Sequence, residues 1–263
     1  MTTSAETIRV HTRDGVGWIA ICNPAKKNAL STAMMSQLAE ILDELDRDNS
    51  VAVMVLHGEG SDAFIAGADI GEFELQQTIA DARAESDLAI ASLFDTCRLI
   101  TTPLIAMVDG YCIGAGVAVA LHADIRIATA RATFAIPAAR LGLGYPVDQV
   151  FMLVHAVGPG MASEILFSAR KLDAAEALSA GLVNRVVESD DLAETVGELA
   201  RTVAANAPLT VRAAKAAIRA AVLGTDVSRA EADVRTAQCG SSEDVREGQR
   251  AFMQKRRPTF TGR

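Results

Sequence analysis

The sequence predicts a mixed α/β fold with parallel strand pairing, followed by a region made only of helices. Short apolar segments rich in β-branched residues alternate with longer amphipathic segments over about the first 190 residues. Strand–helix–strand alternation with long crossovers is typical of parallel pairing. After Ser189 no segment has the pattern of a strand, so the rest of the chain is predicted to be helical.

Four segments carry the strand pattern, and two carry a helical one. The predicted strands are residues 16–21, 51–58, 104–108 and 125–129. Between the first two, residues 31–47 repeat apolar side chains at helical spacing, with Ser31 as the N-cap. These apolar positions are Met34, Leu38, Ile41, Leu42 and Leu45. A second amphipathic helix is predicted at 81–100, with an apolar side made of Leu88, Ala91, Leu93 and Leu99.

Composition excludes several functional classes. The 263 residues are 50% hydrophobic and 22% charged, which argues against disorder, and the net charge of −8 argues against a nucleic-acid binder. No secretory signal is recognisable, and the longest apolar run, residues 111–121, falls short of a membrane span. The four cysteines are far apart and form no metal motif, so buried reduced thiols are expected. A cytoplasmic protein is predicted.

Two glycine-bearing turns each follow a predicted strand. They are residues 64–70, Phe-Ile-Ala-Gly-Ala-Asp-Ile, and residues 109–116, Asp-Gly-Tyr-Cys-Ile-Gly-Ala-Gly. Small residues let the backbone approach a ligand, and a helix start offers free N–H groups. Side by side, such turns can form an oxyanion hole, in which each donor contributes about 3 kcal/mol to transition-state stabilisation. The alternative is that the glycines only permit tight turns. The third spaced glycine of a dinucleotide-binding loop is missing.

Several segments in the same order resemble the crotonase (enoyl-CoA hydratase/isomerase) family. The similar segments are residues 23–30, 63–70, 103–124, 177–187 and 251–260. The resemblance implies a crotonase-like spiral of ββα units over residues 1–190 and a C-terminal helical oligomerisation region over 191–263. A homotrimer or homohexamer is expected.

The same resemblance assigns candidate site residues. The backbone amides of Ala66 and Ala115 are the expected oxyanion donors. Expected contacts to coenzyme A come from Lys26, Lys27, Ala29, Ala68, Asp69, Ile70 and, across a subunit boundary, Lys255. The substrate would be an acyl-CoA thioester, and neither a metal nor a redox cofactor is implied.

The sequence departs from the family where hydratases carry two glutamates. The positions that match them hold Ala118 and Ala138, and alanine cannot transfer a proton. A family amide thought to hold the catalytic water matches Pro146, which has no N–H. Asp148 enters the same loop and is a candidate acid/base; its alternative role is the N-cap of a helix over 149–157.

The leading functional hypothesis is an enzyme that acts on an acyl-CoA through an enolate-like intermediate. Hydration, isomerisation, decarboxylation and thioester hydrolysis all stay open, because both usual carboxylates are replaced. The rival hypothesis is a non-catalytic acyl-CoA-binding or assembly subunit.

Overall fold

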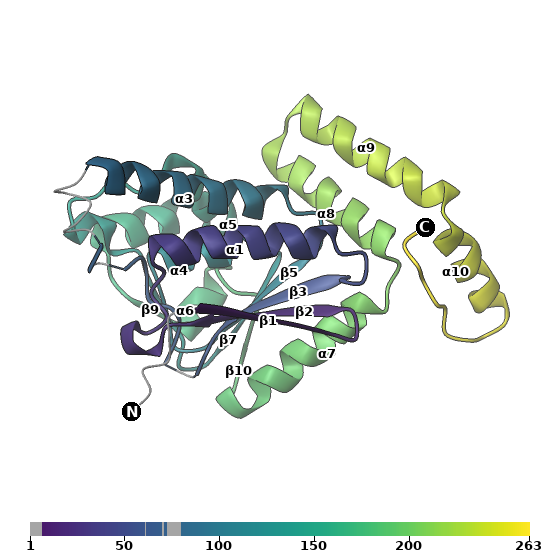
Figure 1. The fold of residues 1–263 in the computed structure, drawn as a ribbon, viewed down its shortest axis with the longest axis horizontal. Coiled ribbons are helices and arrows are strands. Elements are labelled where there is room, and N and C mark those ends of the chain that lie inside the picture. Colours follow the sequence, from purple (N-terminus) through teal and green to yellow (C-terminus); the bar gives the residue numbers. More distant parts are fainter. Residues whose placement is uncertain (1–6, 61, 70, 73–79) are drawn as a thin grey trace.

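Two β-sheets covered by helices make up the computed structural model, which describes residues 7–60, 62–69, 71–72 and 80–263 (Figure 1). The large sheet has the strand order β1 (Thr7–Arg13), β2 (Val16–Cys22), β3 (Val53–Gly58), β5 (Leu104–Val108), β7 (Ile125–Thr129) and β10 (Arg185–Val187). β1 and β2 pair antiparallel, and the other neighbours pair parallel. All four predicted strands are therefore confirmed.

A small second sheet lies beside the first and has the order β4 (Ala63–Ile65), β6 (Tyr111–Ile113), β8 (Thr133–Ala135) and β9 (Leu172–Asp173). β4, β6 and β8 are parallel, and β9 is antiparallel to β8. Strands β3, β5 and β7 of the large sheet are each followed by a short strand of the small sheet and then by helix. This repetition confirms the predicted spiral of ββα units. Three-residue strands are too short to carry a periodic pattern, so sequence alone missed them.

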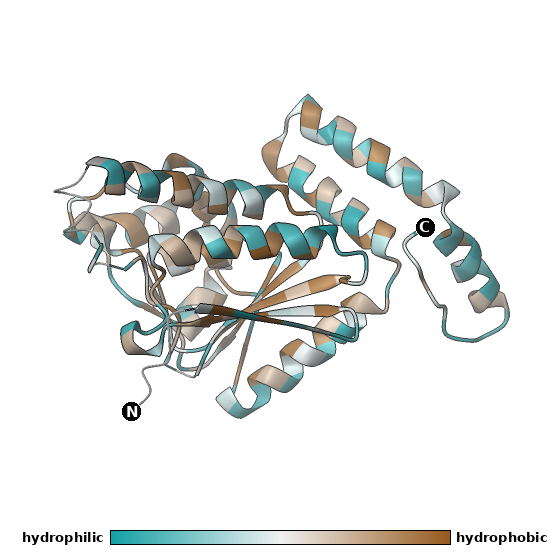
Figure 2. Ribbon diagram, viewed as in Figure 1, coloured by the Kyte–Doolittle hydropathy of each residue, from teal (hydrophilic) through white to brown (hydrophobic). Residues whose placement is uncertain are grey.

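The large sheet is covered on both faces, and its strands alternate accordingly. In β3, Val53 and Val55 pack in the smaller apolar cluster with helix α7 (Leu192–Ala204), whereas Met54 and Leu56 pack in the main core. Figure 2 shows the central strands of the large sheet as largely apolar. Helix α7, the first helix after residue 190, therefore packs on the large sheet.

The main core lies between the sheet and four helices: α1 (Thr32–Arg47), α3 (Ala80–Leu99), α4 (Ala115–His122) and α5 (Val147–Ser168). Ser31 caps α1 as predicted, because its Oγ accepts the Met34 N–H at 3.2 Å. The predicted apolar side of α3 is wrong in part. Leu88 and Leu99 are 71% and 68% exposed and Ala91 is exposed as well, and the buried stripe is Ala89, Leu93 and Cys97 at four-residue spacing.

The remaining helices are α6 (Ala174–Ser179), α8 (Pro208–Leu223), α9 (Asp226–Ser241) and α10 (Glu243–Met253), with short 3-10 turns at Pro24–Lys26, Pro137–Arg140 and Ser189–Asp191. Helix α8 is anchored to the core by Lys215. Its buried ammonium donates to the Thr102 carbonyl at 2.9 Å and the Asp124 carboxylate at 2.8 Å. Helices α9 and α10 extend away from the sheets, as Figure 1 shows. The prediction that helices and no strand follow residue 190 is confirmed as far as Met253, and residues 254–263 form no helix.

Helix α5 has the length and apolar composition of a membrane span, unlike any other helix in the described ranges. That is weak evidence, since helices of water-soluble folds pass the same test. The helix is also interrupted at Gly158, whose φ of 75° and ψ of 163° are not helical, and by Pro159. The cytoplasmic location stays a prediction.

All four cysteines are free thiols. Cys22, Cys97 and Cys112 are buried as expected, whereas Cys239 on α9 is only half-buried. Burial raises the pKa of the Cys97 thiol to about 12, so this thiol is protonated at neutral pH.

Candidate active site

The two glycine-bearing turns meet at one edge of the small sheet. β4 pairs parallel with β6, with Ile65 opposite Cys112. The carboxyl ends of parallel neighbours lie at the same edge, so the turn after β4 and the turn after β6 emerge side by side. The two segments singled out in the sequence are thereby brought together.

Gly116 lets these turns approach closely. A Cβ at this position would lie 2.2 Å from the Ile65 carbonyl oxygen, closer than any side chain tolerates. Gly114, which precedes α4, has a φ of 55° and a ψ of −109°, a conformation that essentially only glycine adopts. The glycines of the second turn are therefore needed to bring α4 against β4.

The first turn is held in place by the loop over residues 23–30. The Leu30 N–H donates to the Gly67 carbonyl at 2.9 Å, and the Asp69 N–H donates to the Leu30 carbonyl at 2.8 Å. Asn28 fixes the loop from inside, because its side-chain amide donates to the Ala63 carbonyl at 2.7 Å. The loop and the turn thus form one hydrogen-bonded unit.

The hydrogen bonds of this unit bear on which amide can serve as an oxyanion donor. The Ala66 N–H donates to the Lys27 carbonyl at 3.2 Å, so it is not free, and the assignment of this amide needs correction. Gly67 and Asp69 both bond to Leu30, so the N–H of Ala68 between them points away from that loop. In the described part of the chain the Ala68 N–H has no acceptor.

Ala115 supplies a second unpaired amide at this edge. It is the first residue of α4, and the first bond within that helix runs from the Ala118 N–H to the Gly114 carbonyl at 3.1 Å. The amide of a first helical residue has no acceptor inside its own helix. Ala68 and Ala115 both line the same cavity.

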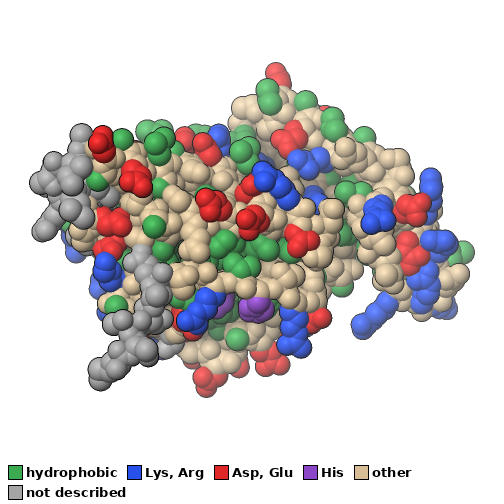
Figure 3. Space-filling model, in the orientation of Figure 1, with side chains coloured by type: hydrophobic (Ala, Val, Ile, Leu, Met, Phe, Trp, Pro, Cys, Tyr) green, Lys and Arg blue, Asp and Glu red, His purple; other side chains and the backbone are tan. Residues whose placement is uncertain are grey.

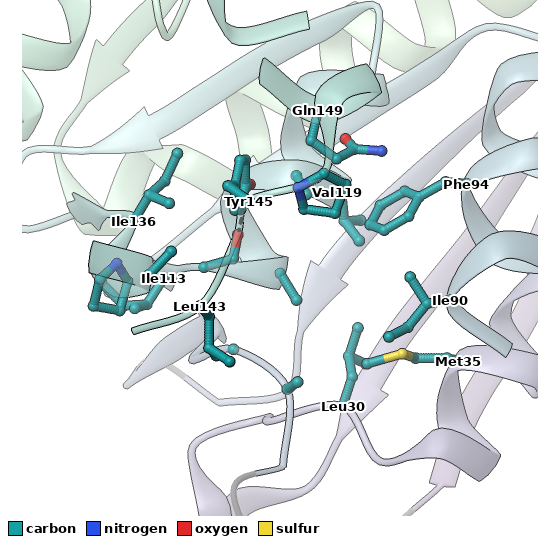
Figure 4. A pocket seen from close by; sticks show the side chains of 18 of the residues that line it. Leu30, Met35, Ile90, Phe94, Ile113, Val119, Ile136, Leu143, Tyr145 and Gln149 are labelled. Carbon is teal, nitrogen blue, oxygen red and sulfur yellow. Dashed lines mark hydrogen bonds between the residues drawn. The ribbon is translucent and has the colours of Figure 1, made fainter. Parts of the chain in front are cut away.

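That cavity has a volume of about 590 Å³ and lies between α3, α4, the turns and the start of α5 (Figure 4). Its walls are mostly apolar; Leu30, Met35, Ile90, Phe94, Ile113, Val119, Ile136 and Leu143 are among the lining side chains. Ala118 and Ala138 both line it as well. A carboxylate at either position would face the cavity, and this chain has a methyl group at both.

Polar side chains are few around the cavity. The Tyr145 hydroxyl donates to the Gly114 carbonyl at 3.3 Å, and burial raises the pKa of this phenol. Gln149 is buried, and its Oε1 lies 3.2 Å from His122 Nε2. Asp87 is the one carboxylate in the described lining; it is exposed on α3 and lies 4.0 Å from Arg83.

Asp148 lies apart from these groups. It is exposed in the first turn of α5 and is not among the residues that line the cavity. Its alternative role as an N-cap is wrong, because the helix is preceded by Pro146 as N-cap and has no side-chain cap bond. The next residue, Gln149, faces the cavity instead. A single buried amide in an apolar helix is the signal that could have pointed to it.

The predicted coenzyme A contacts are divided between several places. Lys26 forms an ion pair with the buried Asp69, and the Lys27 ammonium lies 4.7 Å from the centre of the Tyr111 ring. Lys171, which the sequence did not suggest, lies 5.3 Å from the same ring. Ala29 is buried in the loop next to Leu30, and Ile70 lies outside the described residues.

Lys255 is not brought to the cavity within one chain. It follows α10, at the opposite end of the molecule from the amino-terminal part of α3 that borders the cavity (Figure 1). A contact between Lys255 and a ligand in this cavity would have to come from another copy of the chain.

Comparisons with known proteins identify the family. Residues 11–263 match the model of the enoyl-CoA hydratase/isomerase family. A short-chain-enoyl-CoA hydratase from Clostridium acetobutylicum is 35% identical over 92% of each chain. The 2,3-dehydroadipyl-CoA hydratase of Escherichia coli is 34% identical over 93% of this chain and 94% of the relative.

Solved structures show the same likeness. The crystal structure of an enoyl-CoA hydratase/carnithine racemase from Magnetospirillum magneticum superposes with a TM-score of 0.92 at 34% identity, covering 99% of this chain and 97% of that one. The match extends over the sheets, the cavity and the C-terminal helices together. The chain is therefore a member of the enoyl-CoA hydratase/isomerase, or crotonase, family of acyl-CoA-processing proteins.

Proposed function

We propose that this protein is an enzyme that binds an acyl-CoA thioester in the cavity and stabilises its enolate with the N–H groups of Ala68 and Ala115. The observation that carries the proposal is the pair of unpaired amides at one edge of one apolar cavity. Two donors aimed at a thioester oxygen favour the enolate over the neutral ester, because negative charge develops on that oxygen. The thioester carbonyl accepts the electron pair, so the reaction needs neither a metal nor a redox cofactor.

The group that moves the proton defines the reaction, and two carboxylates are candidates. Asp87 borders the cavity, and Asp148, the acid/base predicted from the sequence, lies in the first turn of α5 and outside the cavity lining. Simple hydration is disfavoured, since Ala118 and Ala138 occupy the positions that match the family glutamates. Isomerisation, decarboxylation and thioester hydrolysis are the remaining family reactions.

Coenzyme A would lie outside the cavity along the 23–30 loop. Lys27 contributes its carbonyl to the turn that contains Ala66, and its ammonium, with that of Lys171, gives this surface a local positive charge. Phosphate groups are attracted to such a pair of cations. The backbone of Ala68 and the side chain of Ala29 would complete the contact with coenzyme A and leave room for the thioester.

A second candidate function is a non-catalytic acyl-CoA-binding subunit. The observation that favours it is the wholly aliphatic pair Ala118 and Ala138 in the cavity wall. Such a protein would bind the thioester without exchanging its α-protons.

Deuterium exchange separates the two functions. The protein is incubated in heavy water with saturated and unsaturated acyl-CoAs, and mass spectrometry follows deuterium at the α-carbon. Exchange is expected in the wild type, and its loss in either Asp87→Asn or Asp148→Asn identifies the base. The matched control is Asp233→Asn on α9, an exposed aspartate far along the chain from the cavity. Binding without exchange would establish the non-catalytic function, and absence of binding would contradict both.

A further inference from the structure

Gln149 is the part of the cavity that the proposed function leaves unused. Its side chain is only 2% exposed, lines the cavity and lies in the first turn of α5 (Figure 4). Its Oε1 lies 3.2 Å from Nε2 of His122, the last residue of α4. Burial lowers the pKa of His122 to about 4, so the ring is neutral at pH 7 and can donate its one N–H to the amide oxygen.

This arrangement leaves the amide nitrogen of Gln149 as an unused donor. In the described part of the chain its NH₂ group has no protein acceptor, and Arg212 Nε is the one side-chain atom there that is both enclosed and unpartnered. The Gln149 nitrogen is therefore open to the cavity. A ligand that fills the cavity displaces water from this nitrogen, so the site favours a ligand that supplies an oxygen at this point.

The length of α4 indicates how far along the ligand that oxygen would lie. Ala115 opens the helix and His122 closes it, so α4 spans on the order of 10 Å, at 1.5 Å per residue, between the proposed oxyanion donor and the residue that contacts the Gln149 amide. The wall between them carries apolar side chains, including Ala118, Val119 and Phe94. A ligand that reaches both ends needs an apolar middle and a polar atom toward its far end.

We propose that Gln149 recognises a neutral oxygen, a hydroxyl or a ketone, near the far end of the acyl chain. The inference deepens the proposed function and rests on it, because the thioester carbonyl must lie at Ala68 and Ala115. A carboxylate is disfavoured, since Arg83 is the one cation in the described lining and it is exposed beside Asp87. Purely hydrocarbon chains would leave the Gln149 donor unpaired.

The test compares octanoyl-CoA with octanoyl-CoA that carries a hydroxyl at carbon 6, 7 or 8, or a ketone at carbon 7. Calorimetric titration of the wild type is expected to give at least one oxygenated ligand that binds about tenfold more tightly than octanoyl-CoA. In Gln149→Met, a side chain of similar length without a donor, the ratio of the two dissociation constants is expected to fall to about one. Gln238→Met, at an exposed glutamine on α9, is expected to keep the wild-type ratio.

The ratio of the two dissociation constants is informative because a loss of folded protein lowers the measured binding of both ligands equally. A wild type that binds octanoyl-CoA but shows no preference for any oxygenated ligand overturns this inference and leaves the proposed function standing. A preference that survives in Gln149→Met overturns it as well. If no acyl-CoA binds the wild type, the proposed function fails and this inference fails with it.

Discussion

Ala115 occupies a position where a single backbone atom can be tested. It is the first residue of α4, and the site uses its N–H rather than its methyl group. Proline is well tolerated at the first position of a helix, because the missing N–H has no partner inside the helix and the fixed φ suits it. A proline here removes one proposed oxyanion donor with little effect on the fold.

Ala115→Pro is expected to slow α-proton exchange about 100-fold or more, the usual cost of losing one oxyanion donor. The melting temperature is expected to change little, and both are measured on the same preparation. Asp226→Pro, at the exposed first position of α9, is the matched control and is expected to exchange at the wild-type rate. Unchanged exchange in a folded Ala115→Pro protein would show that this amide is not a donor.

The oxyanion pair also shows what sequence reasoning could and could not reach. The glycine-bearing segments and the longer strands β3 and β5 are local patterns, so they were predicted, whereas the short strands β4 and β6 were not. The choice between Ala66 and Ala68 depends on the Lys27 carbonyl, which a loop far away in sequence brings to the turn. Gln149 was missed for the same reason, because its partner His122 comes from another helix.

At the scale of elements, two carboxylates of α10 hold the tail, residues 254–263, by hydrogen bonds. Glu247 accepts hydrogen bonds from Arg256 at 2.5 and 3.0 Å and from the Thr259 N–H at 3.1 Å. Asp244 accepts the Thr261 and Gly262 N–H groups at 2.7 and 2.9 Å. These bonds run to side chains, and residues 254–263 form neither a helix nor a strand. Helix spacing could not reveal them, since the partners lie 9 to 18 residues apart.

The Glu247 contacts predict a pH-dependent release of the tail. The Arg256 hydrogen bonds lower the pKa of Glu247 from 4.5 to about 2. A carboxyl whose folded pKa is depressed stabilises the docked tail above pH 4.5 and loses that effect as the pH falls toward 2. Amide exchange of residues 257–262, corrected for intrinsic rates, is therefore expected to rise over that interval.

Glu247→Gln is expected to raise exchange of the tail already at pH 7, while exchange of the strands stays unchanged. Glu243→Gln on the same helix is the control, because the Glu243 side chain lies 4.0 Å from its arginine partner and accepts no tail hydrogen bond within the described residues. Equal protection of the tail in both variants would contradict the role of Glu247.

At the scale of the whole molecule, the C-terminal helices present apolar side chains that one chain leaves uncovered. Val227 and Val234 on α9 and Phe252 and Met253 on α10 are between 58% and 83% exposed. Figure 3 shows acidic and basic side chains gathered over the α10 end of the molecule, beside hydrophobic ones. Mixed apolar and charged surfaces of this kind are typical of protein–protein interfaces.

We expect the protein to be a homotrimer or a homohexamer assembled through these helices. Light scattering coupled to size exclusion is expected to give three or six times the chain mass of 27.7 kDa. Phe252→Glu is expected to lower that mass, whereas Val10→Glu, at a half-exposed position on the edge strand β1, is expected to leave it unchanged. A monomeric wild type would contradict the prediction.

The assembly also decides the role of Lys255, which follows α10 and does not line the cavity of its own chain. If a neighbouring copy places this ammonium beside bound coenzyme A, Lys255→Ala weakens acyl-CoA binding about three- to tenfold and leaves the particle mass unchanged. Arg257→Ala, two residues further along the tail, is the matched control. In Phe252→Glu particles that have come apart, Lys255→Ala is expected to have no further effect on binding, because the neighbour that supplies the charge is absent. An equal effect of Lys255→Ala in assembled and dissociated protein would show that the lysine acts within one chain.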